Sequence, residues 1–165
     1  MATEYGSIVV GTAGTEEGVK LVQKNGASKV FNHRATGYVD EIIKEYPEGF
    51  DLIVEMFAHL NLANDLKLLA PRGQVAIVGS RGETNINPRW LMKEENRIFG
   101  VMLSKSTTDD WAASSSSISK FFCTSRFRPV IARVYPLMSL SSAHIDIMDN
   151  KGAKGKLIIS VNDQL

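Results

Sequence analysis

Short apolar runs alternate with helix-like segments along most of this chain. Five runs, each closed by a turn signal, begin roughly 20 to 25 residues apart: Ser7–Gly11, Lys29–Asn32, Phe50–Glu55, Gly73–Gly79 and Arg97–Met102. Short runs rich in β-branched residues, separated by helical sequence, predict βα units that feed a parallel sheet. Glycines and small polar residues gather where these runs end, and parallel sheets bind ligands at the carboxyl ends of their strands. The pattern therefore predicts a nucleotide-binding α/β sheet.

The segments between the runs predict helices with recognisable ends. Thr15 suits the N-cap of a helix over Glu16–Asn25, and Gly26 is placed to end that helix in the left-handed conformation. A turn centred on Pro136 is predicted towards the end of the chain. The other predicted elements are helices over Tyr38–Tyr46, Leu60–Leu69, Thr107–Phe122 and Ser141–Met148, and a strand over Lys156–Val161.

Composition limits the class of protein. A chain of 165 residues ordinarily forms one domain, and its hydrophobic fraction of 44% is typical of a globular fold. The net charge of +1 gives no indication of nucleic-acid binding. A single Cys123, together with the separated His33, His59 and His144, disfavours a metal site. We interpret His59 and His144 as structural and Cys123 as a small core or boundary residue. No apolar stretch is long enough to span a bilayer, which favours a cytoplasmic protein.

Several enzyme motifs are excluded. The sequence has no Tyr-x-x-x-Lys pair, no P-loop and no G-x-S-x-G elbow. The glycines after the first apolar run are spaced G-x-x-G-x-x-x-G, which differs from the G-x-G-x-x-G of dinucleotide-binding turns.

The turn Gly11–Thr15 bears on the choice of cofactor. It contains no Asp or Glu of the kind that grips the ribose 2′-hydroxyl of NAD, so the 2′-phosphate of NADP could approach its backbone N–H groups. The same residues also suit a tight turn that binds no ligand. Glu16 and Glu17 weigh against an anion, which leaves both interpretations open at this point.

Six motifs stand in a fixed order along the chain: Gly11–Gly18, Asn25–Ala27, Val30–Arg34, Val78–Gly82, Ile86–Arg89 and Gly155–Leu157. Their order and spacing resemble the quinone oxidoreductase (zeta-crystallin) branch of the medium-chain dehydrogenase/reductase family. Each motif alone is weak, whereas the ordered set is specific and covers nearly the whole chain. The resemblance implies a Rossmann-like doubly wound parallel sheet. It also implies a partial NADP-binding domain over residues 1–134 and a C-terminal segment over residues 135–165 that would pack with a catalytic domain.

The resemblance implies an NADPH-dependent, zinc-independent oxidoreductase that reduces quinones. By motif, Gly14 would lie by the adenosine 2′-phosphate, His33 would cover the adenine, and Asn61 would contact the cofactor beyond the third apolar run. Val78, Gly79, Ser80 and Arg81 would line the cofactor groove, and Val101, Met102 and Leu103 would lie near the nicotinamide. Because Gly79 ends a strand and has no side chain, the backbone there could approach a ligand closely. Arg81 could also be a charged residue of a solvated loop that binds no ligand. The edge strand 97–102 would join two copies in a homodimer.

The amino terminus departs from the family pattern. Met1–Gly6 resembles the tail of the first Rossmann helix, and no segment here matches the first strand, its Gly-rich turn or the barrel-like catalytic domain. In the strand order 3-2-1-4-5-6 that first strand is central. We therefore interpret the chain as a fragment and expect the 165 residues alone neither to fold cooperatively nor to reduce quinones.

Two other functions remain open. The chain could be a catalytically inactive structural or interaction protein, either crystallin-like or a truncated paralogue. A different nucleotide-dependent α/β enzyme, such as a methyltransferase, is disfavoured because the sequence has no acidic Gly-x-Gly segment.

Overall fold

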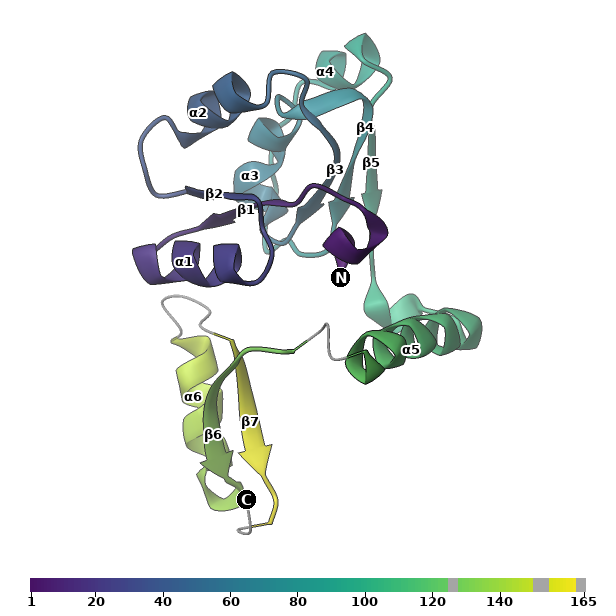
Figure 1. Ribbon diagram of the computed structural model, residues 1–165. Helices are drawn as coiled ribbons and strands as arrows, with labels where there is room; N and C mark the ends of the chain where they lie inside the picture. The colour runs from purple at the N-terminus through teal and green to yellow at the C-terminus, as the bar shows by residue number, and fades with distance from the viewer. Residues whose placement is uncertain (125–127, 150–154, 163–165) are drawn as a thin grey trace. The chain divides into compact units, whose positions relative to one another are not determined.

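The chain folds into parallel sheets with helices packed beside them, which confirms the predicted α/β class. A computed structural model describes residues 1–124, 128–149 and 155–162 (Figure 1). It divides into two compact units, one formed by Met1–Ala35 with Ala113–Leu165 and the other by Thr36–Ala112. We call these unit 1 and unit 2 and describe each by itself. The division of the chain at residues 134 and 135 stays a prediction.

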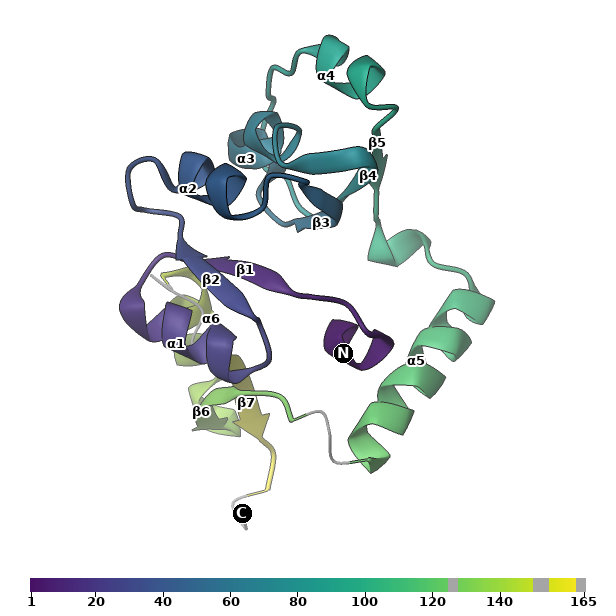
Figure 2. The same cartoon turned by 45° about the horizontal axis from the view of Figure 1, so that its top comes forward.

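The N-terminal part of unit 1 is a βαβ element. Its parts are the strands β1 (Val10–Ala13) and β2 (Lys29–Asn32), the helix α1 (Glu16–Lys24) and a short 3₁₀ helix, η1 (Ala2–Tyr5). β1 and β2 pair in parallel, and α1 lies beside both strands (Figures 1 and 2). The Thr15 hydroxyl oxygen accepts a backbone N–H from the first turn of α1 at 3.1 Å. Gly26 follows the helix with a φ of 105°. Both predicted helix ends are therefore confirmed.

Two strands and a covering helix form the C-terminal part of unit 1: β6 (Ile131–Pro136), α6 (Leu140–Met148) and β7 (Lys156–Ser160). A 3₁₀ turn, η3 (Leu137–Ser139), leads into α6. The predicted turn centred on Pro136 is wrong, because Pro136 closes a strand that pairs in parallel with β7. Tyr135 of this strand is buried, and its hydroxyl donates to Asp146 of α6 at 2.5 Å. The predicted final strand and last helix are confirmed to within one residue.

Unit 2 contains a three-stranded parallel sheet in the order β3-β4-β5. Its elements are the strands β3 (Phe50–Glu55), β4 (Leu69–Ile77) and β5 (Arg97–Gly100) and the helices α2 (Tyr38–Glu45), α3 (Ala58–Asp65) and α4 (Pro88–Lys93). Ile53, Val75 and Ile98 occupy one row of the register, and Val75 is completely buried. This row packs with Leu62 of α3, so the core of unit 2 lies between α3 and one face of the sheet (Figure 2).

The opposite face of this sheet is more exposed. Val54, Ala76 and Phe99 form the next row of the register, and alternate residues of a strand point to opposite faces. Val54 is 60% exposed and Phe99 is 43% exposed, although Ala76 between them is buried. The third strand of the sheet, β5, pairs with β4 alone among the described strands and is therefore an open edge.

The boundary between α3 and β4 differs from the sequence prediction. A helix was predicted to run to Leu69, but α3 ends at Asp65 and Leu69 already pairs with Phe50. Phe50 N–H donates to the carbonyl of Leu68 at 2.8 Å, so pairing with β3 draws these leucines out of the helix. Pro71 and its neighbours loop out of the pairing before the ladder resumes, which explains why the sequence signalled a break there.

A helix of 16 residues, α5 (Thr108–Cys123), follows a short 3₁₀ turn, η2 (Leu103–Lys105), and agrees closely with its prediction. Cys123 at its end is exposed, so its assignment to the core or to a boundary position is wrong. Across the described ranges, no helix combines the length and apolar character needed to cross a membrane.

The leucines of α3 allow a matched test of this core. Leu62 is 6% exposed and Leu60, two residues earlier on the same helix, is 64% exposed. Leu62→Ala should lower the free energy of unfolding by about 2 to 5 kcal/mol, because it removes buried methyl groups and leaves a cavity. Leu60→Ala, the control, should lower it by less than about 0.5 kcal/mol. Chemical denaturation of both variants, each made in the protein expressed from the whole open reading frame that contains these residues, makes the comparison, and equal losses would contradict the described orientation of α3.

Candidate functional site

The carboxyl ends of β1 and β2 bring two polar side chains, His33 and Arg34, beside Gly14. A β-carbon at Gly14 would lie 2.7 Å from Nε2 of His33 and 2.8 Å from Nε of Arg34, so only glycine leaves room for both side chains in this arrangement. Nδ1 of His33 lies 3.4 Å from the Thr12 hydroxyl, which ties the ring to the end of β1. The structure therefore brings the two predicted residues Gly14 and His33 together within unit 1.

Arg34 is a member of this cluster that the sequence analysis did not single out. Its backbone N–H donates to Oδ1 of Asn32 at 3.0 Å, a short turn that begins where β2 ends. The guanidinium is exposed and lies against Gly14. A positive charge next to a glycine turn suits a phosphate group. The motif Asn32-His33-Arg34 contained the signal, because an arginine followed the predicted histidine at a strand end.

In unit 2 the ends of β3 and β4 approach each other closely. The carbonyl of Glu55 accepts N–H groups from Val78 at 2.8 Å and from Gly79 at 3.3 Å, and Ala58 N–H donates back to the Gly79 carbonyl at 3.0 Å. A β-carbon at Gly79 would collide with the Met56 carbonyl. The close approach of the Met56 carbonyl therefore requires glycine at position 79. This packing requirement is independent of the predicted approach of a ligand.

The loop after β4 carries the predicted residues Val78, Gly79, Ser80 and Arg81. His59 supports this loop from α3, because its Nδ1 accepts the Arg81 backbone N–H at 3.2 Å. The Ser80 hydroxyl donates to the carbonyl of Gly82 at 3.1 Å, which closes the turn. His59 therefore has a structural contact, as predicted, and the Arg81 side chain is left exposed.

The last predicted group lies where β5 ends. Val101 N–H donates to the Ile77 carbonyl at 2.8 Å, so Val101 continues the pairing of β5 with β4. Val101, Met102 and Leu103 are all exposed. Unit 2 thus gathers its predicted residues at the carboxyl edge of one sheet, while Gly14 and His33 form a separate cluster in unit 1.

A buried pair of carboxyl groups lies beneath this edge and was missed by the sequence analysis. Glu55, the last residue of β3, and Asp65, the last residue of α3, are each only 7% exposed. Oε1 of Glu55 accepts the backbone N–H of Phe57 and the side-chain amide of Asn61, the latter at 3.3 Å. Glu55 and Asp65 share a hydrogen bond. An acidic residue in the apolar run of β3 was the signal available in the sequence.

The pair shifts the protonation of its members. Burial, followed by the charge of Glu55 and their hydrogen bond, raises the pKa of Asp65 from 3.8 to about 8. Burial also raises the pKa of the Tyr38 hydroxyl on α2, with smaller contributions from Asp65 and Glu55. At neutral pH Asp65 is therefore largely protonated, and its carboxyl group can donate to Glu55.

Residues 1–120 match the family model for zinc-binding dehydrogenases. This chain belongs to that family. A quinone oxidoreductase of Sus scrofa is 47% identical over 160 residues, which are 96% of this chain and 49% of that protein. The chain thus spans about half the length of the curated relatives it matches. These findings confirm the resemblance to quinone oxidoreductases that the motifs predicted.

Solved structures of the same architecture confirm the Rossmann-like fold. An NAD-dependent alcohol dehydrogenase matches with a TM-score of 0.84 at 24% identity, covering 98% of this chain and 46% of that one. A mycobacterial protein complexed with NADPH matches with a TM-score of 0.80 at 19% identity, covering 96% of this chain and 50% of that one.

The described residues of this zinc-binding dehydrogenase chain do not fit a zinc ion. Within the parts of the chain that the structure describes, no group of three or more His, Cys, Asp or Glu residues could hold a metal. Cys123 is exposed at the end of α5.

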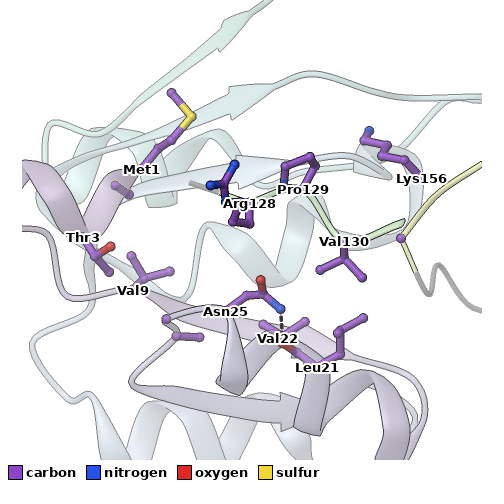
Figure 3. A pocket seen from close by; sticks show the side chains of 14 residues that line it. Met1, Thr3, Val9, Leu21, Val22, Asn25, Arg128, Pro129, Val130 and Lys156 are labelled. Carbon is purple, nitrogen blue, oxygen red and sulfur yellow. Dashed lines mark hydrogen bonds between the residues drawn. The ribbon is translucent and has the colours of Figure 1, made fainter. Parts of the chain in front are cut away.

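A cavity of about 440 Å³ in unit 1 lies apart from the predicted site residues, none of which lines it. Figure 3 shows Val9, Val22 and Val130 facing it, with the side-chain amide of Asn25 hydrogen-bonded at 2.8 Å to the carbonyl of Leu21. The walls of this cavity are largely aliphatic, and the cationic residues Arg128 and Lys156 are also among those that line it.

The Asp65 proton should make stability depend on pH. Because the folded-state pKa of about 8 exceeds the ordinary 3.8, the folded chain holds a proton that the unfolded chain has released between those values. The contribution of this group should be fully present below about pH 4, fall as the pH rises towards about 8, and stay level above it. Asp65→Asn, which keeps a hydrogen-bond donor but cannot titrate, should abolish the decline and exceed the unaltered protein in stability near pH 7. Urea unfolding of the protein expressed from the whole open reading frame, across this pH range, measures the effect.

The exposed Asp51 at the start of β3 supplies the control. Asp51→Asn removes a carboxylate of the same strand without touching the pair, so this variant should keep the decline. Parallel stability curves for Asp65→Asn and the unaltered protein would contradict a shared buried proton.

Proposed function

We propose that this chain is the cofactor-binding part of a cytoplasmic, zinc-independent oxidoreductase that uses NADPH to reduce quinones. The observation that carries the proposal is the cluster of Gly14, His33 and Arg34 at the ends of β1 and β2. The identity of 47% with a quinone oxidoreductase supports the same function. Since the chain spans about half of that relative, the activity is proposed for the protein that contains these residues.

The cluster in unit 1 suits the adenosine end of the cofactor. Arg34 offers a charged fork to a 2′-phosphate, and the absence of a side chain at Gly14 leaves room for Arg34 and His33 beside this turn. His33, tied to Thr12, offers a planar ring on which the adenine can stack. The sequence from Gly11 to Thr15 supplies no carboxylate to grip a ribose 2′-hydroxyl, which favours NADPH over NADH.

The edge of unit 2 suits the opposite end of the cofactor. NADPH supplies a hydride from its nicotinamide ring when it is bound. Asn61 offers an amide, the loop from Val78 to Arg81 offers backbone groups, and the exposed Val101, Met102 and Leu103 offer an apolar surface that excludes water. In this proposal these residues bind and orient the ring.

Replacement of Gly14 tests both the cofactor and the reaction. With the protein expressed from the whole open reading frame that contains these residues, NADPH should be oxidised in the presence of a naphthoquinone. Its kcat/KM should exceed that for NADH. Gly14→Asp should reverse this preference by about 10- to 100-fold, since a carboxylate would pair with Arg34 and repel the 2′-phosphate.

Gly14→Asn is the matched control, because it has the same size as Gly14→Asp without the charge. This control variant should lower kcat/KM for NADPH and for NADH to a similar degree. Equal or NADH-favouring values in the unaltered protein would contradict the choice of cofactor. Absence of quinone-dependent turnover would instead support the alternative of an inert structural or interaction protein.

The open edge of β5 leads to a proposal about assembly. Val101 N–H points to β4, so in a parallel ladder the N–H of Gly100 points to the opposite, open side. An open apolar edge favours pairing with another chain, and we expect a homodimer. Gly100→Pro should remove the outward donor and yield monomers in light scattering, whereas Gly100→Ala should remain dimeric. A monomeric mass for the unaltered protein at micromolar concentration would contradict this proposal.

A further inference from the structure

The amide of Asn61 has a defined orientation in unit 2. Its Nδ2 group lies 3.3 Å from Oε1 of Glu55, which is buried at the end of β3. A carboxylate only accepts hydrogen bonds, so the NH₂ group of the amide must face it. The carbonyl oxygen of Asn61 therefore points away from Glu55. Among the described residues it has no hydrogen-bond partner, and it remains available to a ligand.

Glu55 is itself held in place from two sides. The same Oε1 accepts the backbone N–H of Phe57, which fixes the carboxylate against the turn that joins β3 to α3. Asp65 lies four residues after Asn61, so both side chains project from the same face of α3. Its carboxyl group shares a hydrogen bond with Glu55, and its buried Oδ2 has no partner within the described residues.

We propose that Glu55 and Asp65 form a proton-sharing pair that positions the Asn61 amide for the cofactor at the carboxyl edge of the unit 2 sheet. This inference rests on the proposed function and assigns Glu55 and Asp65 as positioning residues. Asp65 donates its proton to Glu55, and Glu55 turns the amide of Asn61 so that the carbonyl oxygen faces outward.

Loss of the Asp65 proton should disturb this arrangement. Two adjacent buried carboxylates repel each other, and the partnerless Oδ2 shows that the site offers Asp65 no further donor within the described residues. Tyr38 is the other titratable group whose charge interacts with the pair, and its raised pKa keeps it neutral through the range concerned. Asp65 is therefore the group whose ionisation changes the pair.

The expected effect on NADPH affinity follows from this titration. With a pKa of about 8, the protonated fraction of Asp65 falls from about nine-tenths at pH 7 to about one-tenth at pH 9. If only the protonated form presents the amide correctly, the Kd for NADPH should rise about tenfold between these pH values.

The experiment measures the Kd for NADPH by fluorescence titration in the protein expressed from the whole open reading frame. Asp65→Asn keeps the donor to Glu55, so its Kd should equal that of the unaltered protein near pH 7 and stay constant up to about pH 9. Asp65→Ala lacks the donor and should bind about tenfold more weakly near pH 7. Asp51→Asn, the exposed control on β3, should keep the affinity and the pH response of the unaltered protein.

Glu55→Gln tests the orientation. A glutamine at this position can donate or accept, so the amide of Asn61 is free to turn over. This variant should bind NADPH more weakly at every pH. A side-chain amide NMR signal of Asn61, assigned by its loss in Asn61→Ser, should shift with a midpoint near pH 8 in the unaltered protein. It should stay constant in Asp65→Asn.

The outcomes separate this inference from the proposed function. A pH-dependent Kd that persists in Asp65→Asn, or an Asn61 signal that does not titrate between about pH 7 and pH 9, would overturn the positioning pair. Failure of every variant and of the unaltered protein to bind NADPH would overturn the proposed function. In that case the NMR titration, which uses no cofactor, still decides whether Asp65 controls Asn61.

Discussion

The close approach of β4 to the end of β3 is the constraint on which the candidate site of unit 2 depends. The Glu55 carbonyl accepts two N–H groups from the start of the following loop, and Gly79 fits against the Met56 carbonyl only because it has no side chain. These contacts fix the loop that carries Ser80 and Arg81. Because they also fix the turn into α3, one backbone junction positions groups from two different elements.

The side chain of Glu55 adds a second requirement at the same junction. A buried carboxylate is unfavourable by several kcal/mol unless donors surround it, and here Phe57, Asn61 and Asp65 supply them. Burial, followed by the interaction with Glu55, raises the pKa of Asp65, and this shift opposes folding at neutral pH. Replacement of such pairs by neutral groups often stabilises proteins, so stability alone does not explain why this chain holds two acids there. The proposed role in orienting Asn61 would explain it.

Much of the fold could be predicted from the sequence because its signals are local. Thr15 and Gly26 mark the ends of α1 within a few residues, and the apolar run that became β3 is visible without any partner. β6 was missed because it is defined by pairing with β7, whose start lies 25 residues further along the chain than the start of β6. Pro136 at the end of β6 suggested a turn because the pairing of β6 with β7 is not visible in the sequence.

Site residues that belong to a sequence motif could be predicted. The contacts that depend on the folded path of the chain could not. Gly14 and His33 came from motifs, whereas the position of Arg34 against Gly14 depends on a turn that Asn32 closes after β2. The two clusters also differ physically. His33 and Arg34 are exposed, so their effect on a phosphate is screened by salt, whereas Glu55 and Asp65 are buried and screened far less. For the proposed cofactor, the discrimination between NADPH and NADH should therefore weaken with ionic strength, while the orientation set through Asn61 should respond to pH and not to salt.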